Sequence, residues 1–212
     1  MNTNMTMKRF LVALLAMGGM SLALANTEES DICSPFMDGK VDEATVATML
    51  DAAESGYLYR IRRDTSQVGF CVSSGWTQVK GQFSHFSGGL ALVPDDSMHT
   101  ADEQAMVMIQ TASLDTRSDM VEGLIKSESF FDVEHFPEIL FVSHGFIWTG
   151  DDTAQIIGDL TVRGITRQVI FDVTLTPIEL PGNGTVERLL VKAKTTIHRS
   201  DFGMDSLPGL VS

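Results

Sequence analysis

Apolar and polar residues alternate with a period of two from Tyr57 onward, a pattern typical of strands with one buried and one solvated face. In Leu190–His198, every second residue from Val191 is apolar or small, and the residues between them are polar. The same alternation recurs in four other segments, Val68–Val72, Ala105–Ile109, Ile156–Val162 and Val169–Leu175. Two turn sequences, Arg163–Thr166 and Pro181–Gly184, join neighbouring segments as hairpins. The pattern therefore predicts an all-β, antiparallel domain.

One segment inside this β region has a helical pattern instead. Ser118–Phe131 carries four apolar residues on a shared side, Met120, Val121, Leu124 and Ile125. A run of strands interrupted by a single helix is typical of a closed or nearly closed antiparallel barrel. A barrel of about eight strands can hold one ligand. We expect internal volume here because three inward positions are small, namely Gly158, Ala193 and Thr195.

A second helix is predicted before the strands. Asp42 can cap a helix from Glu43 to Glu54, and Gly56 supplies its stop. Its apolar stripe consists of Val46, Met49, Leu50 and Ala53. The acidic segment 26–56 is thus a short helical extension rather than a domain.

The chain begins with a pattern of protein export. Lys8 and Arg9 precede the apolar run Phe10–Leu15, and the small-residue pattern Ala23–Ala25 follows. A membrane anchor is the alternative, but Gly18 and Gly19 interrupt a run that falls short of the roughly 20 residues a spanning helix needs. We therefore divide the chain into a removable signal peptide at 1–25, the helical extension at 26–56 and a barrel at 57–212.

Charge excludes one class of partner. The chain has 15 Lys and Arg against 28 Asp and Glu, a net charge of -13. Nucleic acid is not expected as a partner, because phosphate binding needs clustered basic residues. Binding to an anionic membrane surface by charge alone is disfavoured for the same reason.

Cysteine and histidine usage indicates no reactive centre. Export to an oxidising compartment would allow a Cys33–Cys71 disulfide, with two free thiols as the alternative. No HExxH or other close ligand spacing joins the five histidines, so no metal site is predicted, for His85, His99, His135, His144 or His198. No nucleophile with a paired base is evident either, which favours a protein that is not an enzyme.

The apolar inward positions are the strongest indication of a binding site, although ordinary core packing explains any one of them equally well. The candidate pocket walls are Phe70, Val72, Phe83, Phe86, Val107, Ile109, Phe141, Leu160, Phe171 and Ile197. Burying a hydrocarbon chain contributes about 0.8 kcal/mol per methylene, so a few isoprene units would suffice for tight binding. This arithmetic does not separate an isoprenoid from a fatty acyl chain.

A set of short motifs, in order along the chain, resembles the YceI-like family. They are Tyr59–Ile61, Ser66–Phe70, Val79–Phe83, Phe86–Gly88, Ala112–Thr116, Ser129–Val133, Phe136–Ile139, Gly158–Val162, Gly164–Arg167 and Thr196–Gly203. The resemblance implies a lipocalin-like barrel in the periplasm that binds a polyisoprenoid or related long-chain lipid, such as a quinone or polyprenyl phosphate, without a cofactor. A homodimer stays open.

Two features of this reading leave alternatives. Arg117, Arg167 and Arg199 lie at strand ends and turns, where they either fix corners or meet a lipid headgroup. The alternative function is a structural or stress-response module whose filled barrel binds a protein. The family usually continues past the Asp201–Gly203 motif into a final strand, so we expect either an incomplete sequence or a barrel open at one edge.

Overall fold

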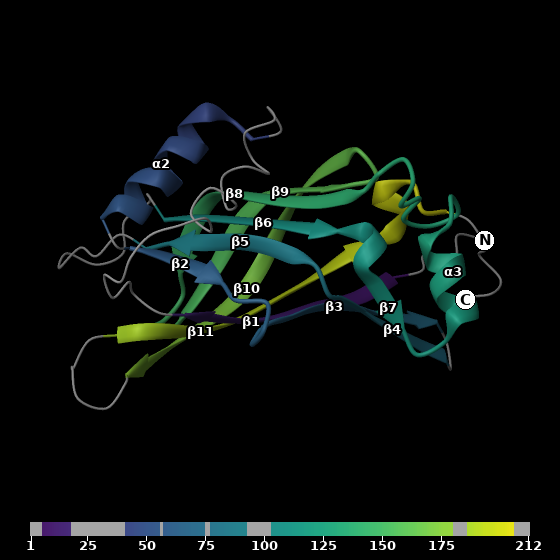
Figure 1. The fold of residues 1–212 in the computed structure, drawn as a ribbon, viewed down its shortest axis with the longest axis horizontal. Coiled ribbons are helices and arrows are strands. Elements are labelled where there is room, and N and C mark those ends of the chain that lie inside the picture. The colour runs from purple at the N-terminus through teal and green to yellow at the C-terminus, as the bar shows by residue number, and fades with distance from the viewer. Residues whose placement is uncertain are drawn as a thin grey trace.

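The strands form one curled antiparallel sheet in the computed structural model, which describes residues 6–17, 41–55, 57–74, 77–92, 103–179 and 186–205. The sheet has the order β11-β10-β9-β8-β6-β5-β2-β1-β3-β4-β7. In chain order the strands are β1 (Thr6–Met17), β2 (Leu58–Ile61), β3 (Gln67–Ser74), β4 (Thr77–Phe83), β5 (Phe86–Ala91), β6 (Gln104–Gln110), β7 (Leu114–Thr116), β8 (Glu138–Trp148), β9 (Thr153–Val162), β10 (Ile165–Glu179) and β11 (Val186–His198). The predicted all-β barrel class is confirmed (Figure 1).

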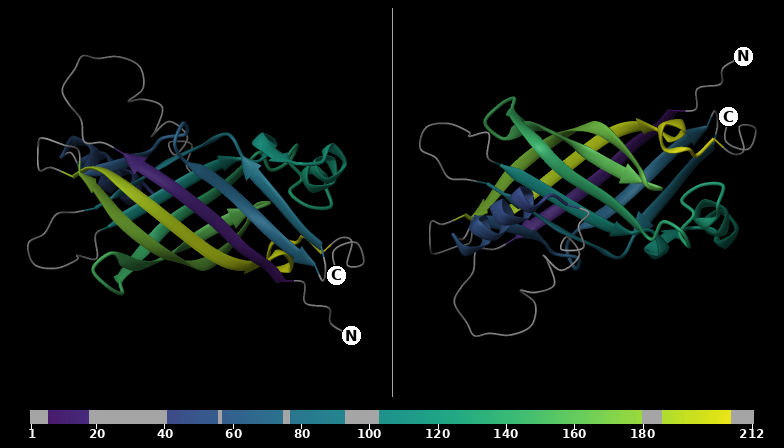
Figure 2. Two further views of the ribbon diagram at one scale, coloured as in Figure 1. Left: turned by 90° about the horizontal axis from the view of Figure 1, so that it is seen from below. Right: turned by 90° about the horizontal axis from the view of Figure 1, so that it is seen from above.

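Several short strands are halves of longer ones. β2 pairs with β5 while β3 pairs with β4, so β2–β3 and β4–β5 make one long, interrupted hairpin. β6 and β7 extend this arrangement, because they pair with β5 and β4 respectively. β1 pairs antiparallel with β11 on one side and with β2 and β3 on the other, which closes the sheet on itself (Figure 2).

The position of β1 bears on two predictions. Residues 1–25 are predicted to be a removable signal, and this stays a prediction, because the structure describes the uncut chain. In that chain the apolar segment Thr6–Met17 is a strand, and it pairs with the edge that we expected to be open. Removing residues 1–25 would leave β11 without a neighbour on one side and β3 without one opposite β4.

The alternation predicted from the sequence decides what is buried. Every second residue of β9 faces the interior, from Ala154 to Val162, and so does every second residue of β10 from Val169 to Leu175. The turn between these strands is the predicted one: Arg163 has φ 52° and Gly164 has φ 68°. Two consecutive positive φ values are typical of the type I′ hairpin turn. The Pro181–Gly184 turn lies outside the described residues, although β10 and β11 pair antiparallel as expected.

Helix α2 (Glu43–Glu54) confirms the predicted extension. The Asp42 side chain accepts a hydrogen bond of 2.9 Å from the backbone N–H of Thr45, as an N-cap does. Its buried face differs from the predicted stripe, because Leu50 is 43% exposed and the buried residues are Thr45, Val46, Met49 and Ala52. This face packs on the outer side of the sheet over Met106 and Met108 (Figure 1). β6 is therefore buried on both faces, which explains its continuous apolar run.

Helix α3 (Asp119–Lys126) is shorter than the predicted helix 118–131. Met120 is 85% exposed, and Ile125 is the only fully buried residue of the helix. After Lys126 the backbone turns, with the N–H of Phe131 donating to the carbonyl of Ile125. This turn inserts Phe131 into the end of the barrel, where it packs edge-on against Phe70 and Phe83. The sequence pattern did not indicate this turn, because Phe130 and Phe131 are also compatible with a helix that continues to residue 131.

Close packing inside the barrel gives the first prediction. A Cβ atom at Gly158 would lie 2.4 Å from the carbonyl oxygen of Val142 and 2.6 Å from the ring of Phe141. Gly158→Ala should therefore lower the free energy of unfolding, measured by urea denaturation, by at least about 2 kcal/mol. Gly123 of α3 is the matched control, since its Cβ would meet nothing within 4 Å. Gly123→Ala should be neutral or stabilise by up to about 1 kcal/mol. Equal effects at both sites would contradict this packing.

Candidate ligand pocket

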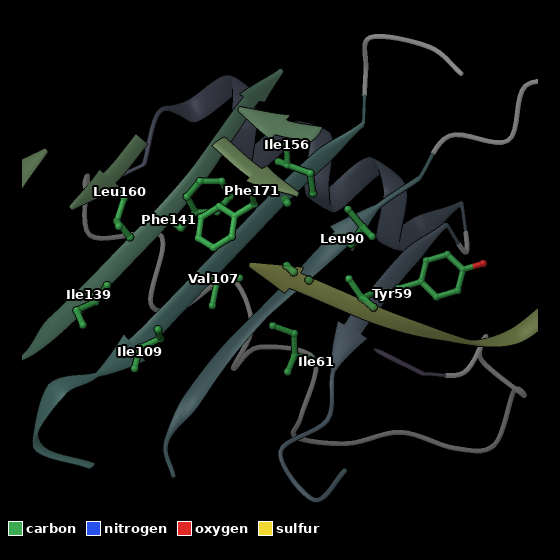
Figure 3. Close-up of a pocket in the computed structure, with 14 residues that line it drawn as sticks. Tyr59, Ile61, Leu90, Val107, Ile109, Ile139, Phe141, Ile156, Leu160 and Phe171 are labelled. Atoms are coloured by element: carbon green, nitrogen blue, oxygen red, sulfur yellow. The ribbon is translucent and has the colours of Figure 1, made fainter. Parts of the chain in front are cut away.

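The barrel interior is filled at one end and hollow further along. At the α3 end the rings of Phe70, Phe83 and Phe131 pack with centroids 5.6 to 5.9 Å apart. Towards the other end lies a cavity of about 80 Å³ (Figure 3). It is lined by Tyr59, Ile61, Gly89, Leu90, Ala105, Val107, Ile109, Ile139, Phe141, Ile156, Leu160, Phe171, Val191 and Ala193.

Small residues and one aromatic pair shape this pocket. Phe141 and Phe171 meet edge to face with centroids 4.9 Å apart, and Figure 3 shows their rings together on one wall. Gly158 allows the Phe141 ring to lie directly on the backbone of β9. Ala105 and Ala193, which also line the pocket, carry only methyl side chains. The result is an apolar space that hydrocarbon can enter without displacing a charge.

Tyr59 carries the one polar side-chain atom among these lining residues. Figure 3 shows its hydroxyl pointing away from the other labelled side chains. Burial raises the pKa of the Tyr59 hydroxyl above its ordinary value. The group therefore stays neutral at physiological pH, when it can both donate and accept a hydrogen bond.

The structure places half of the predicted wall residues at this pocket. Those that line it are Val107, Ile109, Phe141, Leu160 and Phe171. Those buried in the core outside the lining are Phe70, Val72, Phe83, Phe86 and Ile197. Alternation gives the face of a strand but not the level along the barrel, so the two groups look alike in the sequence. Their role in ligand binding stays a prediction.

Residues that the sequence reasoning missed complete the lining. Tyr59 and Ile61 come from β2, Leu90 from β5 and Ile139 from β8. Each lies an even number of residues from another inward-facing residue of the same strand. The alternation of these short strands could have identified them, whereas their level in the barrel could not be read from the sequence.

The three arginines proposed for a headgroup lie outside the pocket lining. Arg199 is 4% exposed, and its guanidinium lies 5.3 Å from the ring centre of Phe130, at the α3 end. Burial lowers the pKa of Arg199, which the charge of Asp205 opposes. Arg117 is exposed before α3. Arg167 is exposed, and its Nη1 donates to the carbonyl of Thr166 at 3.0 Å.

Arg167 does border a cleft in the barrel wall. The pairing of β10 with β11 runs from Asp172 opposite Lys194 to Glu179 opposite Val186. Before Asp172 the two strands separate, and a cleft of about 560 Å³ opens there. Val169 and Thr195, which lie next to Phe171 and Ala193 on the inward face, line this cleft. The cleft and the pocket have no lining residue in common.

Groups capable of other chemistry are sparse in the part of the chain that the structure describes. Within it, no group of three or more His, Cys, Asp or Glu side chains could hold a metal ion. His135 Nδ1 lies 2.8 Å from Asp132 Oδ1, and this contact raises the pKa of His135, but both belong to the turn after α3 rather than to the pocket. Cys71 is half-buried on β3, while Cys33 lies outside the described residues, so their disulfide stays a prediction.

The described helices include none with the length and apolarity to cross a bilayer. The signal segment itself is described as strand β1.

Comparisons with known proteins agree with the fold and its motifs. Among curated relatives, a UPF0312 protein of Pseudomonas putida is 34% identical over 139 residues, covering 65% of this chain and 69% of the relative. A UPF0312 protein of Vibrio parahaemolyticus is 28% identical over 128 residues, covering 60% and 66%.

Solved structures show the same fold. BcnA of Burkholderia cenocepacia superposes with a TM-score of 0.52 at 22% identity, covering 64% of this chain and 98% of that one. The YCEI protein of Campylobacter jejuni gives a TM-score of 0.52 at 21% identity, covering 60% and 72%. The model of the YceI-like domain matches residues 59–212, and the chain belongs to this family.

Proposed function

We propose that this protein binds a long apolar lipid inside its barrel and acts by sequestration, without chemistry on the lipid. The apolar pocket between β2, β6, β8 and β10 carries this proposal, because its described lining offers hydrocarbon alone apart from the Tyr59 hydroxyl. The resemblance to polyisoprenoid-binding members of the family favours an isoprenoid over a fatty acyl chain. No cofactor is part of the proposal.

The size of the cavity limits how much of a tail it holds. The cavity volume of about 80 Å³ is enough for only part of a polyprenyl chain. We propose that the remaining chain passes through the cleft between β10 and β11. Val169 and Thr195 line that cleft and continue the inward face from Phe171 and Ala193. Each buried methylene contributes about 0.8 kcal/mol to binding.

The export pattern adds the compartment to this proposal. Cleavage after Ala25 would deliver the protein to the periplasm, where a soluble barrel can shield an isoprenoid tail and carry it between membranes. The same oxidising compartment supports the Cys33–Cys71 disulfide.

Native mass spectrometry of the protein purified from periplasm tests the cargo. We expect one prenyl-chain lipid per barrel, released on denaturation and identified by its own mass. A protein that carries no lipid and gains no thermal stability from added isoprenoids would contradict lipid binding. It would favour the alternative of a filled barrel that binds a protein partner.

The denatured mass from the same sample tests processing. We expect a chain that begins at Asn26, with its mass lowered by two hydrogen atoms that chemical reduction restores. A chain that retains residues 1–25 would contradict the export prediction. A processed chain whose mass does not change on reduction would contradict the Cys33–Cys71 disulfide.

Filling the pocket should weaken binding without unfolding the barrel. Ala193→Leu adds a branched side chain to the described lining, and the occluded space should weaken the binding of farnesol by about tenfold or more. Lys192→Leu is the matched control, because it introduces the same side chain one residue away on the exposed outer face. Isothermal titration calorimetry measures both. Equal affinities in the two variants would contradict the pocket as the binding site.

A further inference from the structure

Arg167 is a charged residue on the inward face of a barrel strand. In the register of β9 and β10 it lies opposite Leu160. Phe171, four residues further along β10, lies opposite Ile156 in the same way. Directly opposite residues of an antiparallel pair point to the same face, with Cβ atoms about 4.5–5.5 Å apart. Leu160, Ile156 and Phe171 all line the pocket. Arg167 is therefore a cross-strand neighbour of the pocket wall, although it is exposed to solvent.

The cleft between β10 and β11 accounts for this exposure. Its lining includes two buried residues of the inward face, Val169 and Thr195, and two exposed residues of the outward face, Ile170 and Thr196. Since both faces of the two strands contribute, the cleft passes between the strands rather than lying on one side of the sheet. Arg167 belongs to the same lining. It therefore lies where the inward face of β10 meets water.

A structural role fits the neighbouring Arg163 better than it fits Arg167. Arg163 Nη1 donates at 3.0 Å to the carbonyl of Gly203, 40 residues away, and so ties the β9–β10 turn to a distant segment. Arg167 Nη1 donates at 3.0 Å to the carbonyl of Thr166, the residue just before it, which joins no separate elements. No carboxylate of the described residues forms an ion pair with Arg167. Because a guanidinium has five N–H donors, most of them stay available to a ligand.

The charges at the cleft do not cancel Arg167 by contact. The net charge of -13 disfavours an anion at an arbitrary place on this protein. The cleft lining, however, includes two cations, Arg167 and Lys194, beside the carboxylates of Asp172 and Asp201. Lys194 lies opposite Asp172 in the strand register, so those two charges offset each other. Arg167 is thus the cation of this cleft that borders the pocket wall.

We propose that Arg167 binds the lipid headgroup and that the bound lipid carries an anionic, oxygen-rich headgroup, a phosphate or a carboxylate. The inference rests on the proposed lipid binding and names the class of lipid. The planar guanidinium forms two parallel N–H···O bonds with such a group, which adds fixed geometry to the attraction between opposite charges. A neutral alcohol offers a single acceptor oxygen and no charge, so it gains less at the same place.

Two probes that share a tail and differ in the headgroup test this selection. Farnesyl phosphate and farnesol are titrated separately, at low ionic strength, into the protein purified from periplasm and freed of lipid. Isothermal titration calorimetry should show farnesyl phosphate binding at least about tenfold more tightly than farnesol. Added salt should reduce this advantage and leave the affinity for farnesol unchanged, because ions screen exposed charges. Inorganic phosphate, which has the anion without the tail, should bind at least about 100-fold more weakly than farnesyl phosphate.

Substitutions of Arg167 test the residue itself. Arg167→Gln removes the charge and the planar fork, so the preference for farnesyl phosphate should fall to within about threefold while the affinity for farnesol stays the same. Arg167→Lys keeps the charge but loses the fork, and it should retain part of the preference. Arg63→Gln is the matched control, because it removes the same charge from an exposed turn between β2 and β3. It should leave the preference unchanged.

The outcomes separate this inference from the function on which it rests. If the protein binds neither farnesol nor farnesyl phosphate, lipid binding itself fails and the inference fails with it. If farnesol binds as tightly as farnesyl phosphate, or more tightly, lipid binding stands and an anionic headgroup is overturned. A preference that persists unchanged in Arg167→Gln overturns the assignment of Arg167.

The remaining outcomes concern the source of the anion and the folding of the variant. Inorganic phosphate that binds as tightly as farnesyl phosphate would make this a site for a free anion and overturn the headgroup assignment. Should Arg167→Gln not fold, Arg167→Lys decides instead, since a preference that it leaves unchanged contradicts recognition by the planar fork.

Discussion

The hydrogen-bond ladder that runs around the barrel is the constraint on which the other features depend. A curled sheet buries one face of each strand, but it is stable only when the backbone groups at its edges find partners. In the described chain, β1 supplies those partners to β11 and to β2 and β3. The segment that provides closure is also the one with the pattern of a removable signal. Closure after export therefore needs another strand at this position or leaves a seam between β11 and β3.

Within that ring, side-chain volume determines where a ligand fits. Three phenylalanines fill the α3 end, and the turn after Lys126 is what brings Phe131 among them. Further along, Ala105 and Ala193 leave space that no larger neighbour occupies. The pocket is consequently not a general property of the barrel. It follows from the unequal distribution of large and small residues along the barrel axis.

The sequence predicted the features that depend on local chemistry. The period of two identified the strands of the second half, the Arg163–Thr166 turn formed the expected hairpin, and Asp42 capped its helix. Features that depend on tertiary contacts were missed. Met106 and Met108 face outward in the register of β6, yet they are buried because α2 covers them. Met120 looked like part of a buried stripe, but it is 85% exposed, and Ile125 is the one fully buried residue of α3.

The site could be predicted in kind but not in position. Alternation identified inward residues, yet Phe70 and Phe83 lie in the core outside the pocket lining, while Tyr59 and Ile61 line the cavity. Glu103 is a further case, because it directly precedes β6 and reads as a surface residue in an acidic chain, yet it is only 2% exposed.

Trp148, 45 positions away in the sequence, donates its indole N–H to the Glu103 carboxyl group, which offsets part of the cost of removing that group from water. A protein that needed only a hydrophobic core would be more simply built with apolar residues at both positions, since burying polar groups seldom increases stability. The burial of Glu103 thus depends on a contact between distant parts of the chain that no local pattern reports, which is why the sequence could not predict it.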